Sequence, residues 1–129
     1  MEKMKQNFNG QFRERTTRFA VSVNNFLKKV PVNEINRTVI SQLMRSASSI
    51  AANFRAATQN RPEKEYYAKI SLIVEECDET ILWLDLLNEF SPSEEIAVLK
   101  KEAVAMLKIF SSTKKKLVKS SNHQPQIFY

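Results

Sequence analysis

The stretch that decides the fold is residues 96–117, IAVLKKEAVAMLKIFSSTKKKL, near the C-terminal end of the chain. Positions on one side of this stretch recur at alternating steps of three and four residues and are almost all apolar. They are Ile96, Leu99, Ala103, Met106, Phe110, Thr113 and Leu117. Residues with this spacing form one stripe along an α-helix, as in helices that pack lengthwise against other helices. The stretch therefore predicts a helix of a bundle.

Three earlier stretches repeat this spacing. Together with the first they predict helices over about 11–29, 34–59, 63–89 and 93–118. Residues 11–119 are thus expected to form an all-α, antiparallel, up-down, left-handed four-helix bundle. Residues 1–10 are expected to be a flexible N-terminal segment, and residues 120–129 a C-terminal tail.

Helix-breaking and capping residues support these boundaries. Each of the three predicted connections between helices contains a proline: Pro31, Pro62 and Pro92. Asn33 and Ser93 are expected to cap the second and fourth helices, because their side chains can accept a hydrogen bond from a free backbone N–H. The only glycine, Gly10, is expected to act as a hinge before the first helix.

Length and composition indicate one globular domain. The chain has 129 residues, 43% of them hydrophobic and 26% charged. No apolar run approaches the roughly 20 residues that cross a bilayer, and residues 1–7 lack the apolar core of a signal peptide. A lone cysteine, Cys77, fits a reducing compartment. We therefore expect a cytoplasmic protein with no membrane association.

Charge is distributed unevenly along the chain, which has a formal net charge of +6. The balance is +8 in residues 1–62, −7 in residues 63–102 and +5 in residues 103–129. Solvated helix faces can vary in this way without consequence. Alternatively, the segments of opposite charge attract each other, within one chain or between neighbouring chains of an oligomer.

Most enzymatic chemistry lacks the necessary residues. The single histidine, His123, falls in the predicted tail, where no rigid element would hold a general base. One cysteine and one histidine do not make a zinc site, and the Glu-x-x-His pairs of a di-iron bundle are absent from the sequence. Cys77 has acidic neighbours that raise a thiol pKa, and we expect it to be buried and inert. We expect no catalytic residues, no metal and no cofactor.

Nucleic-acid binding is compatible with the arginines of the first two helices. A guanidinium group donates two hydrogen bonds at once to a phosphate. The candidate residues for binding RNA or DNA are Arg13, Arg15, Arg18, Arg45, Arg55 and Arg61. The sequence contains no motif of the usual DNA- or RNA-binding modules.

Two helices carry features of close packing or assembly. The second is rich in serine and alanine, which let another backbone approach closely. The third has more apolar residues than one buried stripe requires. The candidates for a subunit interface or for setting the bundle register are Ser49, Ala52, Asn53, Trp83 and Leu86.

Two segments resemble a known family. They are residues 42–56, QLMRSASSIAANFRA, and residues 65–84, which contain EYYAKISL, EECDET and LWL. They are similar to the bacterial four-helix-bundle proteins encoded by intervening sequences of 23S rRNA genes, and more distantly to the accessory variability proteins of retroelements. The resemblance spans about residues 12–118. Phe54 replaces the commoner isoleucine, and Ala56 stands where many members have glutamate.

The resemblance implies a homo-oligomer, a ring of five, and in the retroelement relatives a basic assembly that binds nucleic acid and a protein partner. Arg45 and Asn53 are the matched motif positions. We expect a non-enzymatic oligomer that associates with RNA or DNA through basic surfaces. The alternative is a protein-interaction scaffold whose charge asymmetry serves ring assembly, with no nucleic-acid role.

Overall fold

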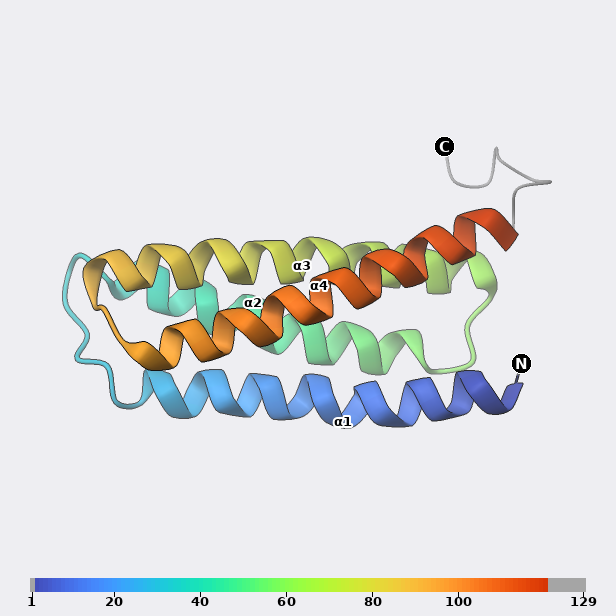
Figure 1. Cartoon of the computed structure of the whole chain (residues 1–129), viewed down its shortest axis with the longest axis horizontal. Helices are drawn as coiled ribbons and strands as arrows, with labels where there is room; N and C mark the ends of the chain where they lie inside the picture. The colour runs from blue at the N-terminus through green and yellow to red at the C-terminus, as the bar shows by residue number, and fades with distance from the viewer. Residues whose placement is uncertain (1, 121–129) are drawn as a thin grey trace.

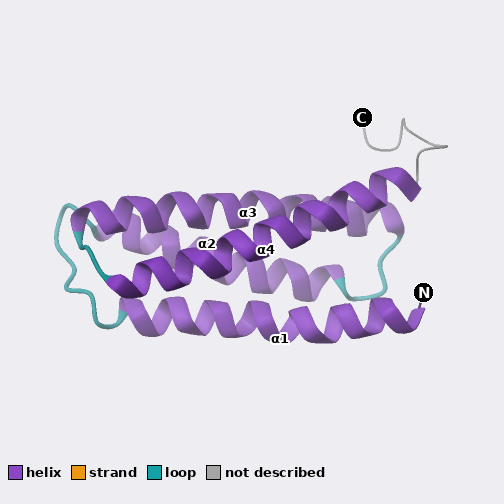
Figure 2. Cartoon of the chain, viewed as in Figure 1, coloured by secondary structure: helices purple, strands orange, loops and turns teal. Residues whose placement is uncertain are grey.

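The computed structural model describes the backbone of residues 2–120 and the side chains of residues 3–120. Four helices account for most of this part of the chain: α1 (Glu2–Leu27), α2 (Arg37–Ala57), α3 (Glu63–Phe90) and α4 (Glu94–Ser120). Figure 1 shows them side by side, with consecutive helices running in opposite directions. Short loops join them at the two ends (Figure 2). The predicted all-α four-helix bundle is confirmed, while its left-handedness stays a prediction.

Helix α1 begins at Glu2 and not near residue 11, so residues 2–10, which were expected to precede the first helix as a flexible segment, are part of it. Phe8 explains the difference, because its ring packs 4.7 Å from the ring of Phe12 at the edge of the core. Gly10 lies inside the helix, and a Cβ added there would meet nothing within 4 Å. Glycine in an exposed helix position costs about 1 kcal/mol, and the partial burial of the Phe8 ring opposes this cost.

Helix α2 begins at Arg37, later than the predicted residue 34. Asn33 nevertheless acts as a cap: its Oδ1 accepts hydrogen bonds from the backbone N–H groups of Ile35 and Asn36, at 2.8 and 2.9 Å. It caps a turn that precedes the helix. The predicted cap of α4 is confirmed, since Ser93 Oγ accepts a 3.2 Å bond from the N–H of Glu95. Ser120, predicted as the first residue of the tail, is the last residue of α4, and residues 121–129, with His123, lie outside the described residues.

The predicted stripes form the core. All the apolar residues of the α4 stripe from Ile96 to Phe110 are buried. At one end of the bundle, four phenylalanines from three helices form a cluster with ring centroids 4.7–6.4 Å apart; they are Phe8, Phe12, Phe54 and Phe110. Phe54 and Phe110 are fully buried.

Asn36 is a buried polar residue that joins two loops at the opposite end. Its Oδ1 accepts a 2.8 Å hydrogen bond from the N–H of Asn33, and its Nδ2 donates to the carbonyl oxygen of Pro31 at 3.0 Å. The same Nδ2 donates to Ser91 Oγ at 3.1 Å. The loop between α1 and α2 is thus tied to the loop between α3 and α4.

The helices do not pack equally on one another. Helix α2 packs most extensively against α3, and α3 packs extensively against α4. Contact between α1 and α4 is slight, although these two helices are neighbours in the bundle. The bundle is therefore open along the α1/α4 edge.

Cys77 is buried on the α3 stripe, as predicted. Burial, together with the smaller effect of the adjacent carboxylates of Glu76 and Asp78, raises the pKa of its thiol to about 12. The nucleophilic thiolate is therefore almost absent at neutral pH. We expect a thiol reagent such as Ellman's reagent to leave the native protein unlabelled and to react with one thiol per chain after denaturation. Rapid stoichiometric labelling of the folded protein would contradict the buried position.

Candidate nucleic-acid and assembly surfaces

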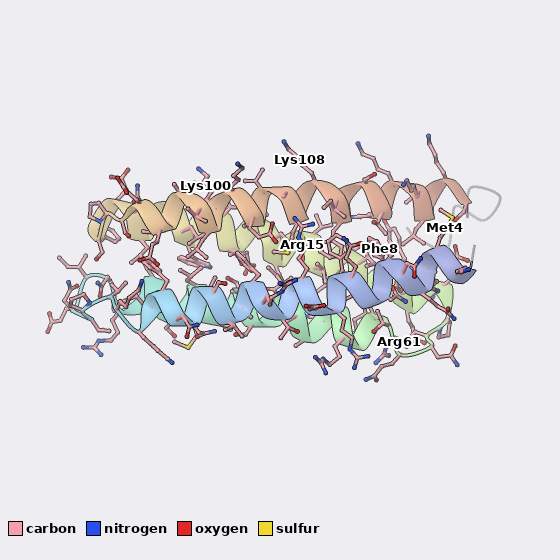
Figure 3. The ribbon with its side chains drawn as sticks, turned by 60° about the horizontal axis from the view of Figure 1, so that its bottom comes forward. Met4, Phe8, Arg15, Arg61, Lys100 and Lys108 are labelled. Atoms are coloured by element: carbon pink, nitrogen blue, oxygen red, sulfur yellow. The ribbon has the colours of Figure 1, made fainter. Side chains whose placement is uncertain are left out.

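Arg15 is committed to an interhelical ion pair and is not a free candidate for phosphate binding. Its Nε and a terminal nitrogen each donate a 2.7 Å hydrogen bond to the Glu102 carboxylate, joining α1 to α4. The hydrogen bond to Glu102 raises the pKa of the guanidinium above its ordinary value. Figure 3 shows Arg15 between the two helices. The sequence did not reveal this partner, because Glu102 lies 87 positions away.

Three further candidates make weaker contacts at the surface. Arg18 lies 3.4 Å from Glu14 on its own helix, and Arg45 lies 3.3 Å from Glu79 on α3. Arg61 donates a 2.6 Å hydrogen bond to the carbonyl oxygen of Ala56 and lies 3.4 Å from the carboxylate of residue 65. Exposed ion pairs of this kind contribute little, so these guanidinium groups can exchange partners.

Arg13 and Arg55 are exposed and have no ion pair within the described residues. Each follows a phenylalanine of the aromatic cluster, Phe12 or Phe54, whose rings lie 6.4 Å apart across α1 and α2. Arg15 on α1 contacts α4, and Ser46 on α2 contacts α3. At about 100° per residue, Arg13 lies on the side of α1 opposite Arg15, and Arg55 lies on the side of α2 opposite Ser46. Arg13 is therefore on the flank of α1 that faces α2, and Arg55 is on the flank of α2 that faces α1. The two arginines therefore lie at one level on one face of the bundle.

A polar pocket lies on the same α1/α2 side, close to the end of α2. Its volume is about 210 Å³, and its lining includes Lys5, Asn9 and Arg61. Asn9 Oδ1 is buried there without a hydrogen-bond partner in the described structure. We call Lys5, Arg13, Arg55 and Arg61 the basic face. Lys5 was missed from sequence because residues 1–10 were not expected to be helical.

Helix α2 contacts α3 through small polar residues. Thr80 Oγ1 donates a 2.8 Å hydrogen bond to Ser46 Oγ, and both residues are buried. Asn53 instead donates from Nδ2 to the carbonyl oxygen of Ser49 on its own helix, at 3.0 Å. The hydroxyl pair of Ser46 and Thr80, which sequence reasoning did not single out, thus forms a buried hydrogen bond between the two helices.

The other assembly candidates occupy the outer sides of α2 and α3. Ala52 is exposed, while Ser49, Trp83 and Leu86 are half-buried. Trp83 packs against the core, and its Nε1 is buried without a hydrogen-bond partner in the described part of the chain. A subunit contact through these residues stays a prediction.

A groove of about 920 Å³ follows the open α1/α4 edge. Phe19, Phe26 and Leu99 of the core form its apolar floor, and Val98 lines it with 70% of its surface exposed. The charged residues that line it are Arg15, Arg18, Lys28, Lys29, Glu95 and Glu102. Both carboxylates are already paired across the groove, Glu102 with Arg15 and Glu95 with Lys29. Arg18 and Lys28 leave the groove positive.

The outer face of α3 has the opposite charge. Its exposed residues at helical spacing are Glu75, Asp78, Glu79, Leu82, Asp85 and Glu89, which we call the acidic stripe. Arg45 pairs with Glu79, and Lys100 pairs with Asp85 at 2.8 Å. Beside the stripe, burial raises the pKa of the Glu76 carboxyl, and one oxygen of that carboxyl has no hydrogen-bond partner in the described structure.

The described residues contain no group of three or more histidine, cysteine, aspartate or glutamate side chains placed to hold a metal ion. Within the same part of the chain, no helix combines the length and apolarity that crossing a membrane requires.

Comparison with known proteins identifies a family and a related solved structure. Residues 10–112 match the family model described as 23S rRNA-intervening sequence protein. The fold is similar to a crystal structure from Bacteroides thetaiotaomicron, a protein of unknown function from the S23 ribosomal protein family. The TM-score is 0.74 at 27% sequence identity, and the match covers 83% of this chain and 97% of that one. No curated protein matches the chain significantly.

Proposed function

Because this chain belongs to the 23S rRNA-intervening sequence protein family, we propose that it is a cytoplasmic, non-enzymatic oligomer that associates with RNA or DNA through its basic face. The observation that carries the proposal is the placement of Arg13 and Arg55. Both are exposed on the α1/α2 side and have no ion pair within the described residues. Unpaired arginines are available to phosphate without first breaking a contact in the protein.

The neighbouring residues extend the same surface. Arg61 is oriented by the carbonyl oxygen of Ala56, and Lys5 lies over the ring of Tyr66 at 5.0 Å from its centroid. Several cationic side chains on one side of a protein can bind the phosphate backbone of a nucleic acid by charge, independently of its base sequence. An oligomer repeats this surface and strengthens attachment to one strand by multivalency.

The test is binding of labelled structured RNA and duplex DNA, measured by fluorescence anisotropy across a salt titration. Wild-type protein should bind at micromolar concentration or tighter, and the affinity should fall with a log–log slope of several units. The variant Arg13→Glu/Arg55→Glu should bind at least about tenfold more weakly and with a shallower slope, because each lost phosphate contact reduces the slope by about one.

A matched control makes the same change of charge elsewhere. Lys101 and Lys108 are exposed on α4. In Figure 3, Lys108 and Arg61 point to opposite sides of the bundle. Lys101→Glu/Lys108→Glu should keep most of the affinity. Equal losses in both variants would mean that net charge alone governs binding, and no binding by wild-type protein at low salt would refute the proposed function.

A second candidate function is a protein-interaction scaffold without a nucleic-acid role. It is favoured by the apolar floor of the groove and by Val98 on its edge. A stable multimer that binds neither nucleic acid at low salt would select this alternative.

A further inference from the structure

The groove and the acidic stripe have opposite charge. In the groove, Lys28 has no ion pair within the described residues, and Arg18 makes only an exposed 3.4 Å contact with Glu14 of its own helix while 74% of its side chain stays exposed. On α3, Glu75, Asp78 and Glu89 have no ion pair within the described residues. Each surface therefore carries uncompensated charge that the other would neutralise.

The two surfaces also match in length. Arg15 on α1 and Lys29, in the turn two residues beyond the end of α1, mark the ends of the groove and are fourteen residues apart, as are Glu75 and Glu89 on α3. At the rise of an α-helix, both distances are about 21 Å. One straight helix face can therefore lie along the whole groove.

Their centres are complementary in shape. Ser22 stands midway between Arg15 and Lys29 on the α1 side of the groove, where its small side chain leaves room. Leu82 stands midway between Glu75 and Glu89 and is 50% exposed. The apolar side chain of the stripe thus faces the smallest residue of the α1 side, above an apolar floor, whichever way the helix runs.

We propose that the α1/α4 groove of one molecule receives the acidic stripe on α3 of a second copy. This rests on the oligomeric part of the proposed function and identifies the two surfaces that meet. Helices α1 and α3 are diagonal in the bundle, so the groove and the stripe of one chain lie on different sides and do not meet each other. A contact between two different faces is heterologous: it repeats head to tail and closes into a ring when the rotation permits.

Charge reversal tests the electrostatic part. Wild-type protein should sediment as a multimer of the 14.9 kDa chain. Arg18→Glu/Lys28→Glu in the groove should raise the dissociation constant at least about 100-fold, because like charges then face each other. Glu75→Lys/Asp78→Lys/Glu89→Lys on the stripe should do the same. Combining all five substitutions in one chain should restore the multimer, since both surfaces have then changed sign.

Disulfide cross-linking tests the geometry independently of charge. A chain with Ser22→Cys and Leu82→Cys should form a ladder of linked chains on oxidation, because the two positions meet only between molecules. The native Cys77 is fully buried and does not interfere. Thr17→Cys with Leu82→Cys is the matched control, since Thr17 is exposed on α1 but does not line the groove. It should form no ladder.

The controls separate this inference from the proposed function. Arg13→Glu/Arg55→Glu should remain a multimer, because the basic face is not part of this contact. If both charge-reversal variants still formed multimers as stable as those of the wild-type protein, the assignment of these surfaces would be wrong, although the protein would still be an oligomer. Equal cross-linking of the Thr17→Cys/Leu82→Cys and Ser22→Cys/Leu82→Cys chains would lead to the same conclusion. A monomeric wild-type protein at low salt would overturn both. Unchanged helical circular dichroism in each variant shows that the bundle is folded.

Discussion

Replacing Phe54 by alanine should reduce the free energy of unfolding by about 3–5 kcal/mol. Phe54 is fully buried, and its ring lies 5.6 Å from the ring of Phe110 and 6.0 Å from that of Phe8. Truncation leaves a cavity where α1, α2 and α4 meet, and the remaining rings lose their aromatic neighbour. The loss is a large fraction of the stability of an ordinary domain.

Urea unfolding followed by circular dichroism measures this effect, and thermal unfolding should show a melting temperature lower by about 10–20 °C. Phe90→Ala is the matched control, because Phe90 is 47% exposed at the end of α3. It should cost about 0.5 kcal/mol or less. A Phe54→Ala variant as stable as this control would show that the aromatic cluster does not hold the helices together.

Replacing Asn36 by leucine should destabilise the protein by about 3 kcal/mol, although the residue is in no candidate site. Asn36 is fully buried and makes three hydrogen bonds that join two loops. Leucine has the same branched arrangement of side-chain heavy atoms but is larger, and it leaves the N–H of Asn33 and the carbonyl oxygen of Pro31 without these partners. A buried polar group without a partner costs more than an ordinary hydrogen bond contributes.

Ser91→Ala provides a graded comparison, because it removes only the 3.1 Å bond to Asn36 Nδ2. It should cost about 1 kcal/mol in the same denaturation measurement. If Asn36→Leu were neutral or stabilising, apolar packing would outweigh the hydrogen bonds at this end of the bundle.

The core was predictable from the sequence because one stripe along each helix is enough to identify it. The positions from Ile96 to Phe110 needed no knowledge of their partners, since spacing alone places them on one side. The start of α1 was missed because Phe8 is a single apolar residue in a polar segment. Only the packed bundle shows that its ring contacts Phe12, Phe54 and Phe110.

The candidate site was less predictable because it depends on which helices are neighbours. Six arginines looked equivalent in the sequence, yet Arg15 is held by Glu102 while Arg13, two residues away, is free of ion pairs among the described residues. The turn of the helix directs the two side chains to different flanks. The same holds on α2, where Asn53 was the candidate for setting the register but Ser46 makes the hydrogen bond to Thr80 of α3. The spacing of residues along α2 does not reveal which small polar side chain meets a hydroxyl group on α3.

The slight contact between α1 and α4 has a thermodynamic consequence. Helix α1 packs extensively only against α2, so we expect it to open locally while α2, α3 and α4 stay folded. An occupant of the α1/α4 groove that binds only the closed helix stabilises it by mass action. If that occupant is a second copy of the chain, the protection of the α1 amides against hydrogen exchange should increase with protein concentration.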